Sequence, residues 1–300
     1  MRDVRYGICI LPEHPWRQAE PLWRHAEERG FDHAWTYDHL VWGGLPDSPW
    51  HSTVATLTAA AMVTERIRLG TFVASPNYRH PVTFTRDVVT LDDISHGRVV
   101  LGLGTGGERD AQILGQHLSR GERTRRFAEF VDLLDRTLTT DHVDHQGEFY
   151  GAVDARNVPG CVQQPRVPFV VAANGPKAMA LAARQGQGWV TTGPAGQAQD
   201  LTDTAAVDAW WDGVGELSER FCVAVEQAVA DGHRPGGHDP DRYLSLDSSG
   251  VPALRSPGFF AEQVGRAREL GFTDVIVHWP RPEDPYRADP AVLDHIELEP

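Results

Sequence analysis

Short apolar runs alternate along the chain with segments in which apolar residues recur at helical spacing. The first run, VRYGICIL at residues 4–11, precedes PLWRHAEERG at residues 21–30, which begins with proline and ends with glycine as helices prefer. Predicted strands occupy residues 4–11, 31–39, 67–75, 98–106, 168–175, 188–193, 242–247 and 274–280. Predicted helices occupy residues 21–30, 52–65, 82–94, 125–139, 176–186, about 204–230 and 259–271. Strands this continuous in apolar residues are buried on both faces, so the alternation predicts an α/β fold, a closed (β/α)8 TIM barrel.

One interval in this alternation is longer than the others. Between the fourth and fifth predicted strands, the helix at residues 125–139 is followed by HVDHQGEFYGAVDARNVPG, residues 142–160. This segment is typical of a hairpin with a Gln146-Gly147 turn. We therefore expect an inserted helix and hairpin between strands four and five. The sequence has no Ser/Gly linker and no block of like charge, so the prediction is one barrel domain over residues 1–300.

Composition and charge narrow the classes of partner. The formal charge of −14 disfavours nucleic acid and anionic membranes. The three cysteines, Cys9, Cys161 and Cys222, are widely spaced and odd in number, which argues against a disulfide framework or a zinc cluster. The chain begins with strand-like residues, and its longest uncharged stretch, residues 48–64, carries polar side chains, so neither a leader nor a membrane span is expected. We expect a cytoplasmic protein without a metal site that acts on a small molecule.

Polar residues stand at the ends of the predicted strands, where parallel barrels place their active sites. Asp38 and His39 close the second strand, although both groups are costly to bury. An imidazole can give or take a proton near neutral pH, so His39 is a candidate general acid or base. The alternative is a structural histidine, since the chain has 14 histidines. Other strand ends carry Ser75, Thr105, Asn174, Thr192, Asp247 and His278.

Four segments together resemble the bacterial luciferase-like family of flavin- and deazaflavin-dependent oxidoreductases. They are AEERGFDHAWTYDH (residues 26–39), the long run from ERIRLGTFVAS to VLGLGTGG (65–107), the run from GEFYGAVDARN to QGWVTTG (147–193), and RARELGFTDVIVHWPRP (266–282). The resemblance thins between Pro194 and Asp241. A second strand that ends in Asp-His with Trp42 close behind is more similar to members that use the deazaflavin coenzyme F420 than to FMN monooxygenases.

The resemblance implies an oxidoreductase that moves hydride between F420 and a small organic substrate, either an alcohol or carbonyl compound or an enone or imine. It also implies a bulged third strand whose non-prolyl cis peptide, by position Phe72-Val73, supports the middle ring of the cofactor. Phe72, Val73, Ala74 and Thr105 are then expected to contact the cofactor. Homodimers are common in this family, so a homodimer is expected.

Side chains near His39 receive roles on the same basis. Asp38 either contacts polar atoms of the cofactor, which we favour, or orients His39; adjacent strand residues point to opposite faces, so direct pairing of the two is not expected. Trp42 either walls the substrate pocket or packs its own loop. Glu108, after strand four, is the second candidate for proton transfer, with a solvated loop carboxylate as the alternative.

The phosphate of the cofactor is expected on the loops after strands five and six. Lys177 is the one lysine among 28 basic residues, and it stands beside Pro176 at a predicted helix start. Helix N-termini disfavour cations, so a lysine there indicates a nearby anion unless the side chain turns to solvent. Asn174, Gly175, Pro176 and Thr192 are the other candidate phosphate contacts. Arg79 and His80 are weaker candidates for binding the acidic tail of the cofactor.

Gly102, Gly104 and Gly107 form a G-x-G-x-x-G pattern, which alone would suggest a dinucleotide fold. This strand is the fourth of a series, no crisp helix is predicted directly after Gly107, and the acid about 20 residues on, Glu122, precedes a helix. A tight bend after a barrel strand is therefore the preferred interpretation. Two functional alternatives stay open: an FMN-dependent two-component monooxygenase and a ligand-binding barrel without catalysis. Substrate-pocket walls are expected from the stretch after strand four and the region after Pro194.

Overall fold

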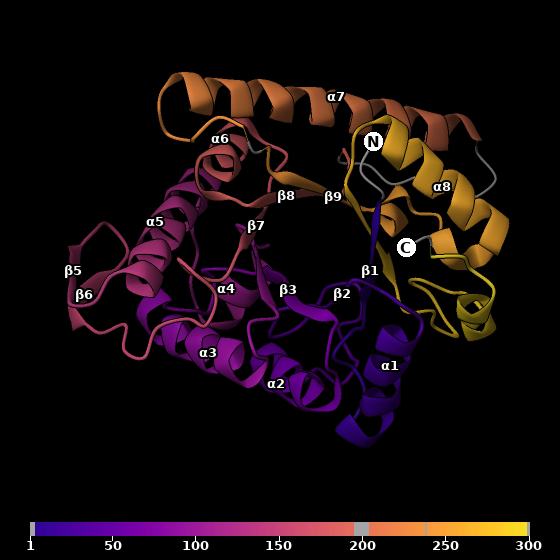
Figure 1. Ribbon diagram of the computed structural model, residues 1–300, viewed down its shortest axis with the longest axis horizontal. Helices are drawn as coiled ribbons and strands as arrows, with labels where there is room; N and C mark the ends of the chain where they lie inside the picture. The colour runs from indigo at the N-terminus through magenta and orange to yellow at the C-terminus, as the bar shows by residue number, and fades with distance from the viewer. Residues whose placement is uncertain (1–3, 195–203, 238, 299–300) are drawn as a thin grey trace. The chain divides into compact units, whose positions relative to one another are not determined.

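Eight parallel strands form a closed barrel in the computed structural model, which describes residues 4–194, 204–237 and 239–298 (Figure 1). The strand order around the barrel is β1-β10-β9-β8-β7-β4-β3-β2. The strands are β1 (Arg5–Cys9), β2 (His33–Thr36), β3 (Arg68–Ala74), β4 (Val99–Leu103), β7 (Phe169–Ala172), β8 (Gly188–Thr191), β9 (Asp241–Ser245) and β10 (Asp274–His278). Every residue of β4, β8 and β10 is buried, as the apolar runs predict. The predicted (β/α)8 barrel is confirmed.

Helices separate the strands along the chain. They are α1 (Trp16–Glu28), α2 (Thr53–Val63), α3 (Pro81–Ile94), α4 (Arg109–Ile113), α5 (Arg120–Thr139), α6 (Pro176–Gln185), α7 (Thr204–Ala230) and α8 (Pro257–Glu269). Three short 3₁₀ helices follow β9 and β10: Leu246–Ser249, Ala253–Arg255 and Pro290–Asp294. The predicted insertion between the fourth and fifth barrel strands is present, with the antiparallel hairpin β5 (Val143–Gln146) and β6 (Gly151–Ala155) beside α5 in Figure 1.

The chain divides into two compact units. One unit comprises residues 1–11, 25–35 and 170–300, and the other comprises residues 12–24 and 36–169. In the first unit, Trp189 of β8 stacks on Phe221 of α7 with ring centroids 4.5 Å apart, which fixes that helix on the strand. In the second unit, the ring of Phe84 on α3 stacks on Phe130 on α5 at 6.2 Å. The assignment of residues 1–300 to one domain stays a prediction.

The start of the first helix differs from the prediction. α1 begins at Trp16, and Pro21 lies inside the helix instead of opening it. The chain enters the helix at Pro15, whose carbonyl oxygen accepts hydrogen bonds from the backbone N–H groups of Gln18 and Ala19. The segment therefore has two prolines near the helix start, and the prediction that Pro21 opens the helix is wrong.

Helix α5 also begins earlier than predicted, at Arg120. Ser119 and Glu122 form a capping box, in which the Ser119 hydroxyl accepts from the backbone N–H of Glu122 and the Glu122 carboxylate accepts from the backbone N–H of Ser119. Glu122 was predicted to precede the helix and instead lies in its first turn. The Ser-x-x-Glu spacing is a readable signal for this start.

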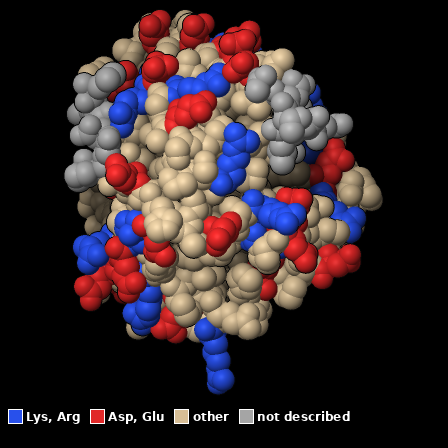
Figure 2. All heavy atoms as spheres, turned by 90° about the vertical axis from the view of Figure 1, so that its right-hand side faces the viewer, with Lys and Arg blue, Asp and Glu red and all other residues tan. Residues whose placement is uncertain are grey.

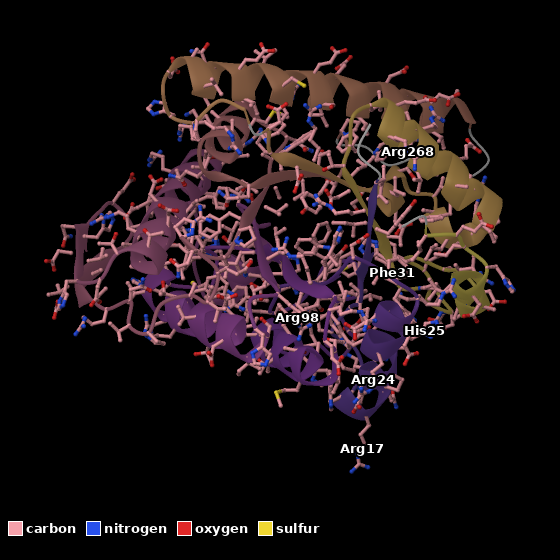
Figure 3. The ribbon with its side chains drawn as sticks, viewed as in Figure 1. Arg17, Arg24, His25, Phe31, Arg98 and Arg268 are labelled. Atoms are coloured by element: carbon pink, nitrogen blue, oxygen red, sulfur yellow. The ribbon has the colours of Figure 1, made fainter. Side chains whose placement is uncertain are left out.

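A buried arginine fastens the segment between α2 and β4. Arg98 is 9% exposed, and Figure 3 shows it inside the fold. Its guanidinium donates hydrogen bonds to the carbonyl oxygens of Ala61 and Thr64 at the end of α2, and to those of Ile67 and Ser95. The last carbonyl groups of a helix have no partner within the helix, so Arg98 supplies the missing donors.

Replacing Arg98 by alanine is expected to lower the free energy of unfolding by about 2–3 kcal/mol, because several buried carbonyl groups lose their donor. Urea denaturation followed by circular dichroism measures this change. The matched control is Arg17→Ala, since Arg17 is exposed and points away from the chain in Figure 3; it should change stability by less than about 0.5 kcal/mol. Equal effects of the two substitutions would contradict the structural role of Arg98.

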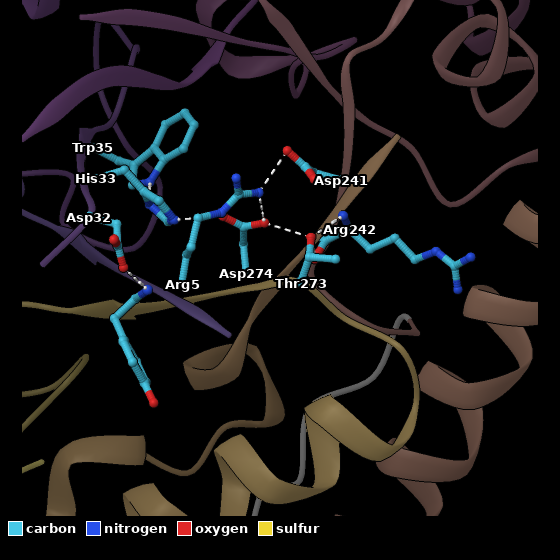
Figure 4. A network of polar contacts seen from close by, with 9 residues as sticks. Arg5, Asp32, His33, Trp35, Asp241, Arg242, Thr273 and Asp274 are labelled. Atoms are coloured by element: carbon cyan, nitrogen blue, oxygen red, sulfur yellow. Dashed lines mark hydrogen bonds and ion pairs between the residues drawn. The ribbon is translucent and has the colours of Figure 1, made fainter. Parts of the chain in front are cut away.

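A second buried polar network lies at the N-terminal ends of β1, β2 and β10 (Figure 4). Asp274 is fully buried and accepts hydrogen bonds from Arg5 Nε and Nη2 at 2.8 and 2.6 Å, and from Thr273 Oγ1 at 2.6 Å. Trp35 Nε1 donates to His33 Nδ1 at 2.6 Å, so in the neutral ring the proton is on Nε2, which lies 3.0 Å from Asp274. This end of a barrel serves stability, because active sites occupy the opposite end.

The surface carries charges of both signs. Figure 2 shows acidic and basic side chains close together over much of one face. Exposed ion pairs of this kind, such as Arg24 with Glu20 on α1 at 2.9 Å, contribute little to stability. Across residues 4–194, 204–237 and 239–298, no helix has the length and apolar character needed to cross a membrane.

Candidate active site

β2 ends at Thr36, three residues before the predicted end, so Asp38 and His39 lie just beyond the strand, and each has its own partner. The Asp38 side chain is completely buried, whereas the His39 side chain is 23% exposed. Asp38 pairs with Arg79 from the segment after β3, and His39 pairs with Asp110 from the segment after β4. The expectation that the two neighbours do not pair directly agrees with this arrangement.

The Asp38 carboxylate is held by two residues of the loop after β3. Arg79 donates from Nε and Nη2, each at 2.6 Å, to the two carboxylate oxygens, and the Tyr78 hydroxyl donates to one of them. Burial, together with the Asp38 charge, raises the pKa of Tyr78, so the hydroxyl stays protonated and acts as a donor. In this structure Asp38 therefore fastens one loop to the next, and Arg79 is its counter-ion. The expected contacts of Asp38 with the cofactor and of Arg79 with its acidic tail stay predictions.

The pair of His39 and Asp110 has the geometry of an oriented imidazole. His39 Nδ1 lies 2.8 Å from Asp110 Oδ2, and the backbone N–H of Leu40 donates to Asp110 Oδ1 at 2.8 Å. Burial opposes ionisation of Asp110, but the hydrogen bonds from His39 and Leu40 outweigh it and lower the pKa of this carboxyl. An ionised Asp110 keeps the ring proton on Nδ1, so Nε2 is the nitrogen that can exchange a proton with a ligand.

Aromatic rings surround this histidine. The Tyr37 ring lies edge-on to His39 and to Trp42, with centroids 6.1 and 5.1 Å away, and it is also 6.0 Å from the Phe72 ring. Trp42 packs on Trp50 at 6.2 Å and is half-buried. Trp42 therefore packs its own loop and also belongs to the aromatic group beside His39, and its contact with substrate stays a prediction.

The third strand carries the predicted bulge. The Phe72-Val73 peptide bond is cis, as expected, and the register between β3 and β4 shifts between Thr71 and Ala74. Phe72 and Ala74 are buried, while Val73 is half-buried. Thr105, after β4, is also half-buried. Their contacts with a cofactor stay predictions.

Gly102 within β4 and Gly106 after it have packing roles. A Cβ on Gly102 would lie 2.0 Å from the Thr71 carbonyl oxygen, so only glycine permits β3 and β4 to approach this closely. Gly106 has φ +67, where a side chain would also meet the Asn77 amide. The predicted tight bend is therefore present, although the five-residue helix α4 does follow it, which the sequence analysis did not predict. The closed barrel excludes the dinucleotide fold.

Residues 4–232 match the family model described as luciferase-like monooxygenase. The chain belongs to this family. A relative from Amycolatopsis mediterranei (strain U-32), an F420-dependent glucose-6-phosphate dehydrogenase, is 30% identical over 295 residues, which cover 91% of this chain and 83% of the relative. An enzyme of the same name from Microbacterium testaceum (strain StLB037) is 33% identical over 296 residues, with 85% of each chain covered.

A solved structure supports the fold of this luciferase-like chain. The coenzyme F420-dependent tetrahydromethanopterin reductase from Methanopyrus kandleri superposes with a TM-score of 0.70 over 97% of this chain and 96% of the other, at 18% sequence identity. The resemblance seen in the sequence is thus confirmed at the level of family and fold.

The acid that reaches His39 in this luciferase-like protein is one that the sequence analysis missed. Glu108, the predicted acid, has a 58% exposed side chain and pairs with Arg123 at 2.9 Å. Asp110, two residues on, is 1% exposed and contacts His39. The two side chains point to different sides of the chain at the start of α4. Both acids stand in a segment predicted as a loop, so the sequence does not show which of them is buried. Proton transfer by Glu108 stays a prediction.

In the other unit, the loops after β7 and β8 are joined through Asn174. Its amide donates to the Gly193 carbonyl oxygen at 2.7 Å and accepts from the Thr191 hydroxyl at 2.6 Å. Gly175 caps α6 and Pro176 opens it, as predicted. Lys177 and Thr192 are exposed. The expected contacts of these residues with the cofactor phosphate stay predictions. The predicted contribution of the region after Pro194 to the substrate pocket falls partly on residues 195–203, which lie outside the described residues.

The same unit contains another imidazole–carboxylate pair. His278 Nδ1, at the end of β10, lies 2.9 Å from Asp247 Oδ2, and the Tyr286 ring stacks on the imidazole. Asp247 also accepts hydrogen bonds from the backbone N–H groups of His278 and Ala253. Both partners are buried, so this pair ties the segments after β9 and β10 together.

Proposed function

We propose that this chain is an F420-dependent oxidoreductase that transfers hydride between the coenzyme and a small alcohol, carbonyl, enone or imine compound. The F420-dependent dehydrogenase relatives support the cofactor and the reaction class. The observation that carries the proposal is the partly exposed imidazole of His39, which is held through Nδ1 by the buried carboxylate of Asp110.

The residues around His39 fit a flat ring system with polar edges. At the bulge, Val73 is half-buried next to buried Phe72, whose ring centroid is 6.0 Å from that of Tyr37. Thr36 Oγ1 and Trp50 Nε1 are buried without a hydrogen-bond partner in the described structure, so a bound group could satisfy them. Residues 72–74 and Thr105 would contact the ring of F420, and Asn174, residues 175–177 and Thr192 would contact its phosphate. When bound, F420 supplies the carbon that gives or accepts the hydride.

His39 would carry the proton that accompanies the hydride. In alcohol oxidation, neutral His39 accepts the hydroxyl proton at Nε2; in reduction, protonated His39 returns it to the oxygen or carbon of the substrate. The Asp110 carboxylate holds the ring in place in either direction, so that Nε2 faces away from it. Asp110 acts through His39 and is therefore a positioning residue.

Binding and turnover test the proposal. We expect the purified protein to bind F420 more tightly than FMN, and reduced F420 to be oxidised by at least one member of a panel of carbonyl and enone compounds. Titration calorimetry measures the binding, and absorbance of the oxidised cofactor measures the turnover. Tight binding of FMN without F420 would support the two-component monooxygenase instead, and F420 binding without any turnover would support a ligand-binding barrel. We also expect a cytoplasmic homodimer. Sedimentation equilibrium would measure the mass of the protein in solution and so test the dimer.

A further inference from the structure

A cavity of about 570 Å³ lies beside the loop that holds Asp38. Tyr78 and Arg79 line it, together with His80, His117, Arg126 and Tyr150. Among the described residues that line this cavity there are two arginines and two histidines and no aspartate or glutamate. We call it the Arg126 pocket. Asp38 neutralises Arg79, so Arg126 is the arginine of this lining whose side-chain hydrogen-bond partners in the described structure are both neutral.

Arg126 is the unusual group in this pocket. It is 6% exposed, and its two terminal nitrogens donate to neutral amide oxygens, Nη1 to Gln116 at 2.8 Å and Nη2 to Asn77 at 2.6 Å. The buried Nε has no hydrogen-bond partner in the described structure. Burial lowers the pKa of Arg126, and the nearby Arg123 acts in the same direction. A buried cation without a carboxylate is costly, so an anion would stabilise this arrangement.

Tyr150 adds a second unused donor. It is 8% exposed, and its hydroxyl is buried without a hydrogen-bond partner in the described structure. Burial raises the pKa of Tyr150, so the hydroxyl keeps its proton and can donate. The Tyr150 ring lies edge-on to His80 at 5.2 Å. His80 Nδ1 accepts the backbone N–H of Val82 at 3.2 Å, which leaves the proton of the neutral ring on Nε2.

We propose that the Arg126 pocket binds an anionic group, a carboxylate or a phosphate, held by the Arg126 guanidinium and the Tyr150 hydroxyl. Guanidinium groups bind both kinds of anion through charge-assisted hydrogen bonds. Tyr78 and Arg79, which line the pocket, also donate hydrogen bonds to Asp38, so the pocket borders the candidate active site. Under the proposed function, the anion belongs either to the substrate or to the acidic tail of F420.

Anion binding to the cofactor-free protein tests the site independently of any hydride transfer. Titration calorimetry with inorganic phosphate and with acetate should show saturable binding of at least one of them. Arg126→Gln should weaken it about tenfold or more, because one charge-assisted contact is lost. The matched control is Arg125→Gln, one residue earlier on α5, whose exposed side chain pairs with Glu148 and which should bind like the wild type.

Tyr150→Phe is the second variant, and it keeps the test decisive if Arg126→Gln does not fold. Its hydroxyl has no protein partner, so its removal should leave the thermal unfolding temperature unchanged or raised, yet weaken anion binding several-fold. Binding that is absent in the wild type, or equal in wild type and Tyr150→Phe, would overturn the proposal and leave Arg126 as a residue that ties Asn77 to Gln116.

A further comparison identifies the source of the anion once the site binds phosphate or acetate. F420 is titrated against a deazaflavin chromophore that lacks the phosphate and acidic tail. If Arg126→Gln weakens binding of F420 more than binding of the truncated chromophore, the tail occupies the pocket. If it weakens both equally or neither, the substrate supplies the anion. Failure of F420 to bind at all would contradict the proposed function while leaving the phosphate and acetate result in place.

Discussion

Replacing His39 by alanine is expected to lower the rate of hydride transfer by about 10²- to 10⁴-fold, the usual contribution of a positioned acid or base. The substrate KM should change far less, since the imidazole is proposed to act on the proton and not to hold the substrate. Steady-state kinetics with F420 and a substrate found in the carbonyl and enone panel measure both constants. Full activity of His39→Ala on every substrate would show that another group moves the proton.

Variants of the two acids after β4 separate a positioning role from general loss of function. Asp110→Asn should slow turnover while leaving the substrate KM nearly unchanged, because the imidazole loses the carboxylate that holds its ring in place. Glu108→Gln is the matched control, since that acid is exposed and paired with Arg123. A large loss in Glu108→Gln with normal kinetics in Asp110→Asn would reverse the assignment of the two carboxylates.

Loss of the Asp274 carboxylate is expected to have the largest effect on stability. Asp274→Ala should lower the free energy of unfolding by about 3–5 kcal/mol, because Arg5 and His33 then face a buried gap where the anion was. Urea denaturation measures the change. The control is Asp208→Ala, which removes the exposed pair with Arg266 and should cost less than about 1 kcal/mol. Similar values for the two variants would mean that the buried network contributes no more than a surface pair.

The same network predicts a dependence of stability on pH. Burial opposes ionisation of Asp274, but the contacts with His33 and Arg5 outweigh it, so the pKa of this carboxyl is lower in the folded than in the unfolded protein. The folded state therefore gains its full contribution above the unfolded pKa of about 3.9 and loses it as the pH falls through the lower, folded value. Unfolding free energies of wild type and Asp274→Asn should accordingly converge as the pH is lowered below about 4. A constant difference across this range would contradict the assignment.

The barrel was predictable because its strands are continuous apolar runs separated by helical patterns, and this periodicity survives errors at the element ends. Two predicted helix starts were wrong. At α1 two prolines, Pro15 and Pro21, stand near the start, and at α5 the Ser119–Glu122 capping box marks a start that the apolar pattern does not show. The cis Phe72-Val73 bond was predicted through family resemblance and not through local chemistry.

The candidate site was predicted less completely than the fold. Asp38 and His39 were predicted because they stand where the apolar run of the second strand stops, which is a local property of the sequence. Their partners come from other loops: Arg79 from the loop after β3 and Asp110 from the segment after β4. Which of several acids becomes buried depends on how the loops pack, and a single sequence does not encode this in any short spacing. The same reason hid the role of Arg126.

The contacts of Asp38 with Tyr78 and Arg79 have a consequence for protein engineering. Because Arg79 and Tyr78 donate to the two oxygens of Asp38, the turns that follow the neighbouring strands β2 and β3 are cross-linked without a covalent bond. Selection for new substrates should therefore spare these two turns and alter exposed positions instead, such as residues 113–115 at the end of α4. Deep sequencing of a selected library should show few substitutions at residues 38, 78 and 79.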